Sequence, residues 1–63
     1  MITITDYITG EIIQCSDMDE AIEIAENRCR KHNEEYCYKR GKHYSENAVY
    51  IVLATEIIIR RKL

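Results

Sequence analysis

Residues 48–60 form a run of apolar, largely β-branched side chains without a polar face. β-Branched residues favour strands, so the run predicts one long strand or a broken one, and a helix capped by Ser45 is the alternative. In a continuous strand, successive side chains point to opposite faces of the sheet. One face would then carry Val49, Ile51, Leu53, Ile57 and Ile59, and the other Tyr50, Val52, Ala54 and Ile58.

Only residues 17–32 have the pattern of an amphipathic helix. Ser16 or Asp17 is a suitable N-cap, acidic residues follow in the first turn, and three basic residues close the last turn. The apolar residues at helical spacing form one stripe flanked by Ile24. Its members are Met18, Ala21, Ile22, Ala25, Cys29 and His32.

Residues 2–15 predict a β-hairpin because apolar and polar side chains alternate on either side of a turn signal. Asp6 can accept hydrogen bonds from the turn amides, and Gly10 can adopt a positive φ. We expect Asp6 to pair with Glu11. This register places four apolar residues on one face and pairs them as Ile2 with Cys15 and Ile4 with Ile13.

Residues 34–39 predict a further strand before a turn at Arg40-Gly41. The element order is then ββαββ, and we expect an α+β fold with a single antiparallel or mixed sheet and one helix packed on one face. Residues 1–63 are expected to form one small domain. The expected core consists of Ile2, Ile4, Ile13, Cys15, Met18, Ile22, Ala25, Cys29, Val49, Ile51, Leu53 and Ile57.

One helix can cover only one face of the expected sheet, so a second apolar face would remain exposed. Two copies stacked by their sheets, or joined edge to edge through the last strand, would form a C2 dimer. We therefore expect a homodimer or a larger protein partner, with hydrophobic contact through Tyr50, Val52 and Ile58. The alternative is that the chain's own tyrosine, lysine and arginine side chains cover this face.

Charge is divided unevenly along the chain. Residues 1–27 contain seven acidic residues and no Lys or Arg, whereas residues 28–63 contain nine basic and four acidic residues. Asp19, Glu23 and Glu26 lie on the predicted exposed side of the helix, where an acidic face can steer toward a basic patch on another protein. The alternative is an ordinary solvated helix face.

The turn after residue 38 suggests a different partner. Basic side chains there stand among tyrosines, and such a hairpin can contact phosphates and stack on bases. Nucleic-acid binding through Lys39, Arg40, Lys42 and Tyr44 is therefore the alternative function. The net charge of −2 weakens it, because nucleic-acid-binding domains are commonly basic overall.

Two arrangements of cysteine and histidine need weighing. Cys29, His32, Cys37 and His43 supply two sulfurs and two imidazoles, which suit tetrahedral zinc. Their order is not a usual zinc-knuckle pattern, and Cys29 lies within the apolar stripe, so core cysteines and ordinary histidines are favoured. Cys37 and His43 could approach each other across a turn, but 63 residues leave little room for a catalytic pocket. We expect no metal, no cofactor and no enzymatic activity.

An odd number of cysteines, no CxxC pair and no basic leader favour reduced thiols and a cytoplasmic location. No apolar stretch is long enough to span a bilayer. The expected function is therefore a small non-enzymatic protein-binding or regulatory domain, of the kind found in bacteria, phages or mobile elements.

A mobility-shift assay over a salt series separates the two functions. If the chain acts by protein binding, it retards neither single-stranded nor double-stranded nucleic acid, even at low salt. Retardation that weakens steeply as salt rises would favour the nucleic-acid alternative, because counterion release from phosphates makes such binding salt-dependent.

Overall fold

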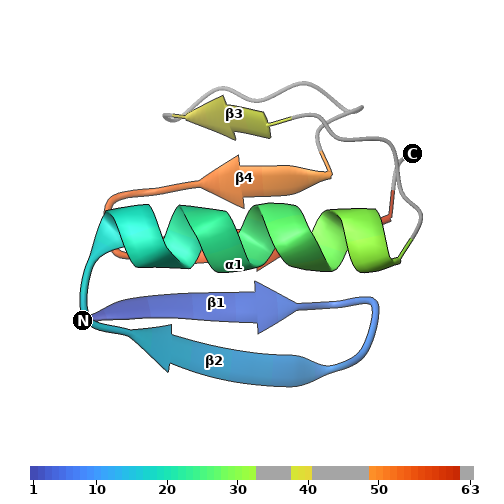
Figure 1. The fold of residues 1–63 in the computed structure, drawn as a ribbon, viewed down its shortest axis with the longest axis horizontal. Coiled ribbons are helices and arrows are strands. Elements are labelled where there is room, and N and C mark those ends of the chain that lie inside the picture. Colours follow the sequence, from blue (N-terminus) through green and yellow to red (C-terminus); the bar gives the residue numbers. More distant parts are fainter. Residues whose placement is uncertain (33–37, 41–48, 62–63) are drawn as a thin grey trace.

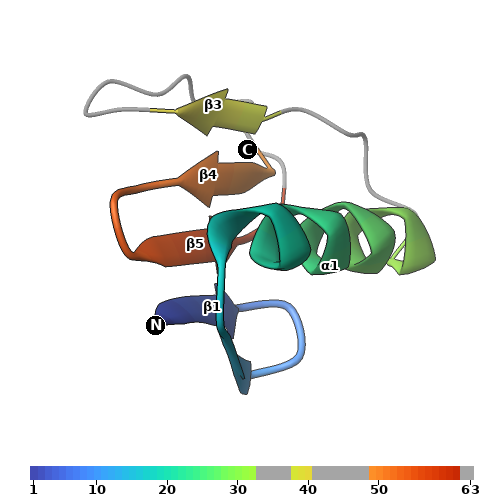
Figure 2. The ribbon, with the colours of Figure 1, turned by 60° about the vertical axis from the view of Figure 1, so that its left-hand side comes forward.

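The computed structural model describes residues 1–32, 38–40 and 49–61. Its elements are β1 (Ile2–Asp6), β2 (Glu11–Cys15), α1 (Met18–Lys31), β3 (Tyr38–Arg40), β4 (Tyr50–Val52) and β5 (Glu56–Ile59). The strands form one sheet in the order β2-β1-β5-β4-β3, and Figures 1 and 2 show α1 packed on one side of it. The predicted α+β class, with a mixed sheet and one helix on one face, is confirmed.

The β1–β2 hairpin has the predicted register. Asp6 pairs with Glu11, and the apolar pairs across the ladder are Ile2 with Cys15 and Ile4 with Ile13. In the turn, Asp6 accepts the amide of Ile8 at 2.9 Å, and Gly10 has a φ of 83°. Because only glycine adopts this φ without strain, turn chemistry and hydrophobic register select the same pairing.

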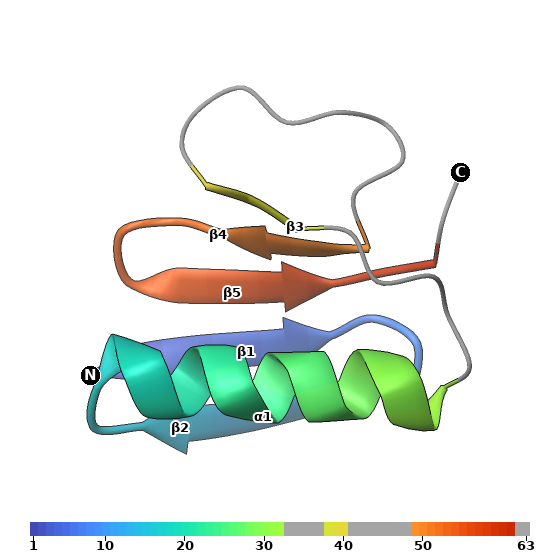
Figure 3. The same ribbon diagram turned by 45° about the horizontal axis from the view of Figure 1, so that its top comes forward.

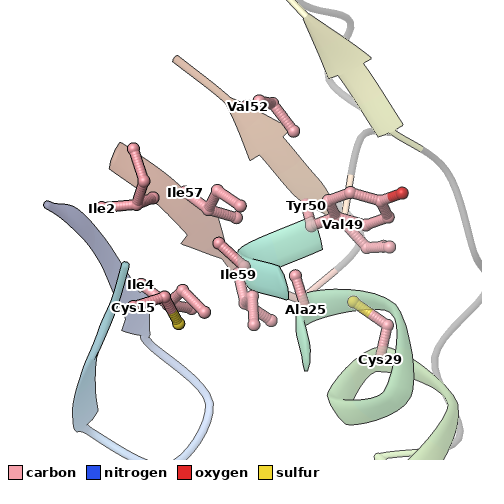
Figure 4. Packing of buried hydrophobic residues seen from close by; sticks show 11 residues of the cluster. Ile2, Ile4, Cys15, Ala25, Cys29, Val49, Tyr50, Val52, Ile57 and Ile59 are labelled. Carbon is pink, nitrogen blue, oxygen red and sulfur yellow. The ribbon is translucent and has the colours of Figure 1, made fainter. Parts of the chain in front are cut away.

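Helix α1 begins where its capping residue predicts. The Asp17 side chain accepts the amide of Glu20 at 2.8 Å, which satisfies one of the unpaired donors of the first turn. The buried face consists of the small residues Ala21, Ala25 and Cys29. Figure 4 shows Ala25 and Cys29 pointing from the helix toward the strands, among the side chains of the core.

The described part of the apolar run, residues 49–60, contains two strands separated by a turn, so the helical alternative is wrong for β4 and β5. The chain reverses at the exposed Ala54-Thr55, where the amide of Leu53 donates to the carbonyl of Glu56 at 2.8 Å. Strands β4 and β5 then pair antiparallel, with Val52 opposite Ile57. The sheet therefore gains a fifth strand, and both halves of the run find partners within it (Figure 3).

This turn also changes which side chains share a face. With residues 53–56 between the paired Val52 and Ile57, even positions of β4 lie beside odd positions of β5. Tyr50 and Val52 are consequently 0% and 1% exposed in the core under α1, together with Ile59. Their predicted place on the outer face is wrong, because that prediction assumed unbroken alternation. Of the three predicted contact residues, only Ile58 lies on the face opposite α1.

The last strand is at the centre of the sheet. Strand β5 pairs parallel with β1 on one side and antiparallel with β4 on the other. Two copies therefore cannot join edge to edge through this strand as predicted. Among the described strands, the edges of the sheet are β2 and β3. Of the strand expected at residues 34–39, the structure describes only the part within Tyr38–Arg40.

Truncating a buried isoleucine should cost far more than truncating an exposed one. Ile57 is 0% exposed, so we expect Ile57→Ala to lower the free energy of unfolding by about 2–5 kcal/mol, a large part of a small domain's stability. Ile12 is 67% exposed, so Ile12→Ala should change it by less than about 0.5 kcal/mol. Urea unfolding of both variants measures this difference, and equal losses would contradict the assigned faces.

Candidate functional site

The sheet face opposite α1 carries a row of apolar side chains. Thr5 of β1 pairs with Ile12 on one side and Ile58 on the other, and Ile58 pairs with Ile51. Directly paired residues lie on the same face, so these four residues form a line across β2, β1, β5 and β4. We call Ile12, Thr5, Ile58 and Ile51 the apolar row.

The apolar row is separate from the core. None of its three isoleucines belongs to the cluster of side chains packed beneath α1. Ile12 is 67% exposed, Thr5 and Ile58 are partly exposed, and Ile51 is buried. Among the described helices and strands, none covers this face, as Figure 2 shows. The apolar side chains on this face are therefore Ile12, Ile58 and Ile51, of which only Ile12 is strongly exposed, and Tyr50 and Val52 do not belong to it.

A polar row runs beside the apolar row on the same face. Thr3 pairs with Gln14 of β2 and with Glu56 of β5. Gln14 is exposed, and Thr3 and Glu56 are partly exposed. This side of the sheet thus combines an apolar line with a border of side chains that can form hydrogen bonds.

The predicted acidic face lies on the other side of the molecule. Asp19 and Glu23 are exposed on α1, as expected. Glu26 is partly buried, and its Oε1 accepts the hydroxyl of Tyr50 at 3.0 Å. Glu26 therefore helps to hold a core tyrosine, and the freely exposed part of the acidic face is reduced to the first half of the helix.

The carboxylate of Asp6 is 0% exposed and has several hydrogen-bond partners. Its Oδ1 accepts the amides of Ile8 and Thr9 at 2.9 and 3.3 Å. Its Oδ2 accepts the Arg28 Nε at 2.8 Å and lies 3.0 Å from the His32 Nε2. The Asp6 side chain thus joins the hairpin turn to the last turn of α1.

The same interactions set the protonation of Asp6. Burial raises the pKa of this carboxyl, but hydrogen bonds from His32, Arg28 and the two turn amides outweigh burial and lower it from 3.8 to about 2. The Arg28 Nη2 also donates to the Glu11 Oε1 at 2.6 Å, which lowers the pKa of Glu11. With both oxygens of Asp6 occupied, the group is suited to holding structure and not to accepting a proton in catalysis.

The cysteines have structural positions where the structure describes them. Cys15 and Cys29 are both buried in the core. Burial, followed by the nearby charges of Glu20 and Asp17, raises the pKa of the Cys15 thiol, which opposes formation of a reactive thiolate. Within residues 1–32, 38–40 and 49–61, no group of three or more His, Cys, Asp or Glu side chains is arranged to hold a metal ion.

Several predicted residues lie outside the described part of the chain. These are Cys37 and His43 of the possible metal set, and Lys42 and Tyr44 of the nucleic-acid alternative. Lys39 and Arg40 belong to edge strand β3, which pairs parallel with β4. Nucleic-acid binding therefore stays a prediction.

Comparisons of the chain with models of protein families, with curated proteins and with solved structures found no significant match. The described part of the chain has no helix of the length and apolarity needed to cross a membrane. The candidate function therefore rests on the geometry of the two faces and the edges of the sheet.

Sequence reasoning missed the role of Arg28 as the partner of Asp6. It treated Arg28 only as a cation favoured in the last turn of a helix. The signal was present in the hairpin register, because Asp6 has the same alternation as Ile2 and Ile4 and must therefore face the helix. A carboxylate on that face needs a cationic partner, and the basic end of α1 is the nearest source.

Asp6 should make the protein less stable in acid. Its folded-state pKa of about 2 lies below the ordinary 3.8, so its stabilising contribution is complete above the ordinary value and is lost as the pH falls toward 2. The expected loss is about 2 kcal/mol. Urea unfolding over this pH range measures it. In the Asp6→Asn variant this loss of unfolding free energy between pH 3.8 and about 2 should be absent. An equal loss in that variant would assign the effect to other titrating groups.

Proposed function

We propose that this chain is a small non-enzymatic protein-binding domain that acts as a homodimer or as a modulator of a larger partner protein. The observation that carries the proposal is the apolar row on the sheet face opposite α1, where Ile12 is 67% exposed. A partner protein that covers this row supplies the layer that the single helix cannot supply on both faces.

The energetics favour contact with an apolar surface. Fully burying one isoleucine side chain contributes roughly 1.5–3 kcal/mol. Ile12 and Ile58 both have surface left to bury, and Thr5 between them adds a methyl group. Polar Thr3, Gln14 and Glu56 border the row and can hydrogen-bond at the rim of an interface, which adds orientation more than affinity.

The acidic residues contribute in a different way. Asp19 and Glu23 lie on α1, which packs against the opposite face of the sheet from the apolar row. They cannot belong to the same small contact. Their role in the proposed function is to steer approach toward a basic partner and to keep that side of the domain solvated, which affects association rate and salt dependence.

Photo-crosslinking in the native host tests this surface. A benzoylphenylalanine placed at Thr5, in the centre of the apolar row, should form a covalent adduct with a protein. The same probe at exposed Glu23 on α1 is the matched control and should form little or none. No adduct from position 5, or equal adducts from both positions, would contradict the proposed contact face.

A second variant tests the chemistry of the contact. Ile58→Lys places a charge in the apolar row and should reduce the yield of the position-5 adduct at least about tenfold, because a buried unpaired ammonium opposes association. Ile58→Val keeps the apolar surface and should retain most of the yield. Circular dichroism of both variants checks that the fold is kept, and an unchanged yield with Ile58→Lys would contradict an apolar contact.

A further inference from the structure

Strand β2 has one neighbour, β1, within the described sheet, and its other side is an edge. The amides of Thr3 in β1 and of Tyr7, which follows β1, point toward the β5 side, where they donate to the carbonyls of Thr55 and Ile59 at 3.0 and 2.8 Å. Amide directions alternate along a strand, so the even-numbered residues of β1 use their backbone groups toward β2.

This alternation fixes which groups of β2 face outward. The partners of the even-numbered β1 residues are Glu11, Ile13 and Cys15, so these three direct their backbone groups toward β1. The amides and carbonyls of Ile12 and Gln14 consequently point off the edge of the sheet. Both residues are exposed. Two donors and two acceptors are therefore arranged in the spacing of an antiparallel ladder.

The β2 edge lacks the usual features that prevent strand pairing. Its sequence, EIIQC, has no proline, glycine, lysine or arginine, and all five of its residues are regularly paired with β1. By contrast, β3 at the other edge of the described sheet has three described residues, and its sequence contains Lys39 and Arg40. Short strands and cations commonly block edge pairing, so the two edges differ in what they permit.

We propose that β2 pairs antiparallel with β2 of a second copy of this chain, about a twofold axis at Ile13. Ile12 of each copy then lies opposite Gln14 of the other, and the outward groups form four backbone hydrogen bonds. The two sheets become one continuous sheet with both helices on the same side. This inference goes beyond the proposed function, because it concerns the edge of the sheet and leaves most of the apolar row uncovered.

Charge favours a second copy as the occupant. Helix α1 has acidic residues in its first turn, Asp19 and Glu20, and the exposed Lys31 in its last turn, where Arg28 is already paired with the carboxylates of the hairpin. The twofold axis makes the two helices antiparallel, so the acidic end of each lies toward the basic end of the other. A strand pairing that made the helices parallel would place like ends together.

The pairing also changes the apolar row. Ile12 is the end of the row at the β2 edge, and the twofold axis places the Ile12 side chains of the two copies diagonally across the new ladder. Diagonal neighbours on one face are within reach of long side chains. The rows of the two copies therefore meet, and the dimer presents one apolar band that spans both sheets on the side away from the helices.

Proline at position 14 tests the edge with little effect on the hairpin. Gln14→Pro removes an outward amide, whereas the β1–β2 bonds come from Ile13 and Cys15 and remain. By symmetry the dimer loses two of its four backbone hydrogen bonds, so its dissociation constant in sedimentation equilibrium should rise at least about tenfold. Gln14→Thr keeps the amide and should dimerise like the natural chain.

Disulfide trapping tests the register without proline. Ile13 faces Ile13 of the second copy in a non-hydrogen-bonded pair, where the Cβ atoms approach closely enough for a disulfide. Ile13→Cys should therefore form a covalent dimer under mild oxidation, well above the background of the natural chain with its own cysteines. Ile12→Cys is the matched control, because sheets stacked by their outer faces would trap position 12 instead of position 13.

The outcomes separate this inference from the proposed function. A dimer insensitive to Gln14→Pro but trapped at position 12, or a natural chain that stays monomeric at millimolar concentration, overturns edge pairing. Neither result decides the proposed function, which depends on the adduct from position 5. Edge pairing with no adduct from position 5 would keep this inference and overturn the apolar contact face.

Discussion

A single helix can shelter only one face of a sheet, and this limit determines how the isoleucine-rich end of the chain is used. The tight turn at Ala54-Thr55 converts one overlong strand into two paired strands. It thereby directs Tyr50, Val52 and Ile59 toward α1 and leaves Ile58 with Ile51 on the other side. The outer apolar face results from this arrangement, because residues of β1 and β2 continue the same line across the sheet.

The other strong constraint is the buried carboxylate of Asp6. Removing this charge from water is costly, and the cost is offset only because two turn amides, Arg28 and His32 all approach it. The result is a polar junction between two elements that are far apart in sequence. It fixes the angle at which the hairpin meets the helix, and hence the position of edge strand β2 relative to α1.

Local signals were sufficient to predict much of this fold. Alternation and turn chemistry identified the pairing of Asp6 with Glu11, and capping by Asp17 identified the start of the helix. The faces of Tyr50 and Val52 could not be predicted, because they depend on where one uniform apolar run breaks. Ala54-Thr55 has no glycine or proline to mark a turn, so only the pairing between the strands shows it.

The candidate surfaces could not be predicted fully either, because they depend on the order of the strands in the sheet. Strand order is a long-range property, and the alternation within each strand says nothing about which strand becomes an edge. The apolar residues of β2 were recognised as a hairpin face, but Ile12 was assigned to neither the core nor the contact. The exposure of Ile12 can be interpreted only when β2 is known to be an edge strand of the sheet.

The parallel pairing of β1 with β5 has a consequence for how the protein is made. Strand β1 is the first of the described strands and β5 the last, so the middle of the sheet cannot close until residues 56–59 have been synthesised. Contacts between such distant segments slow folding, because the intervening chain must be ordered first. Until then the side of β1 that pairs with β5 has no partner strand. A chaperone or a neighbouring nascent chain could bind there.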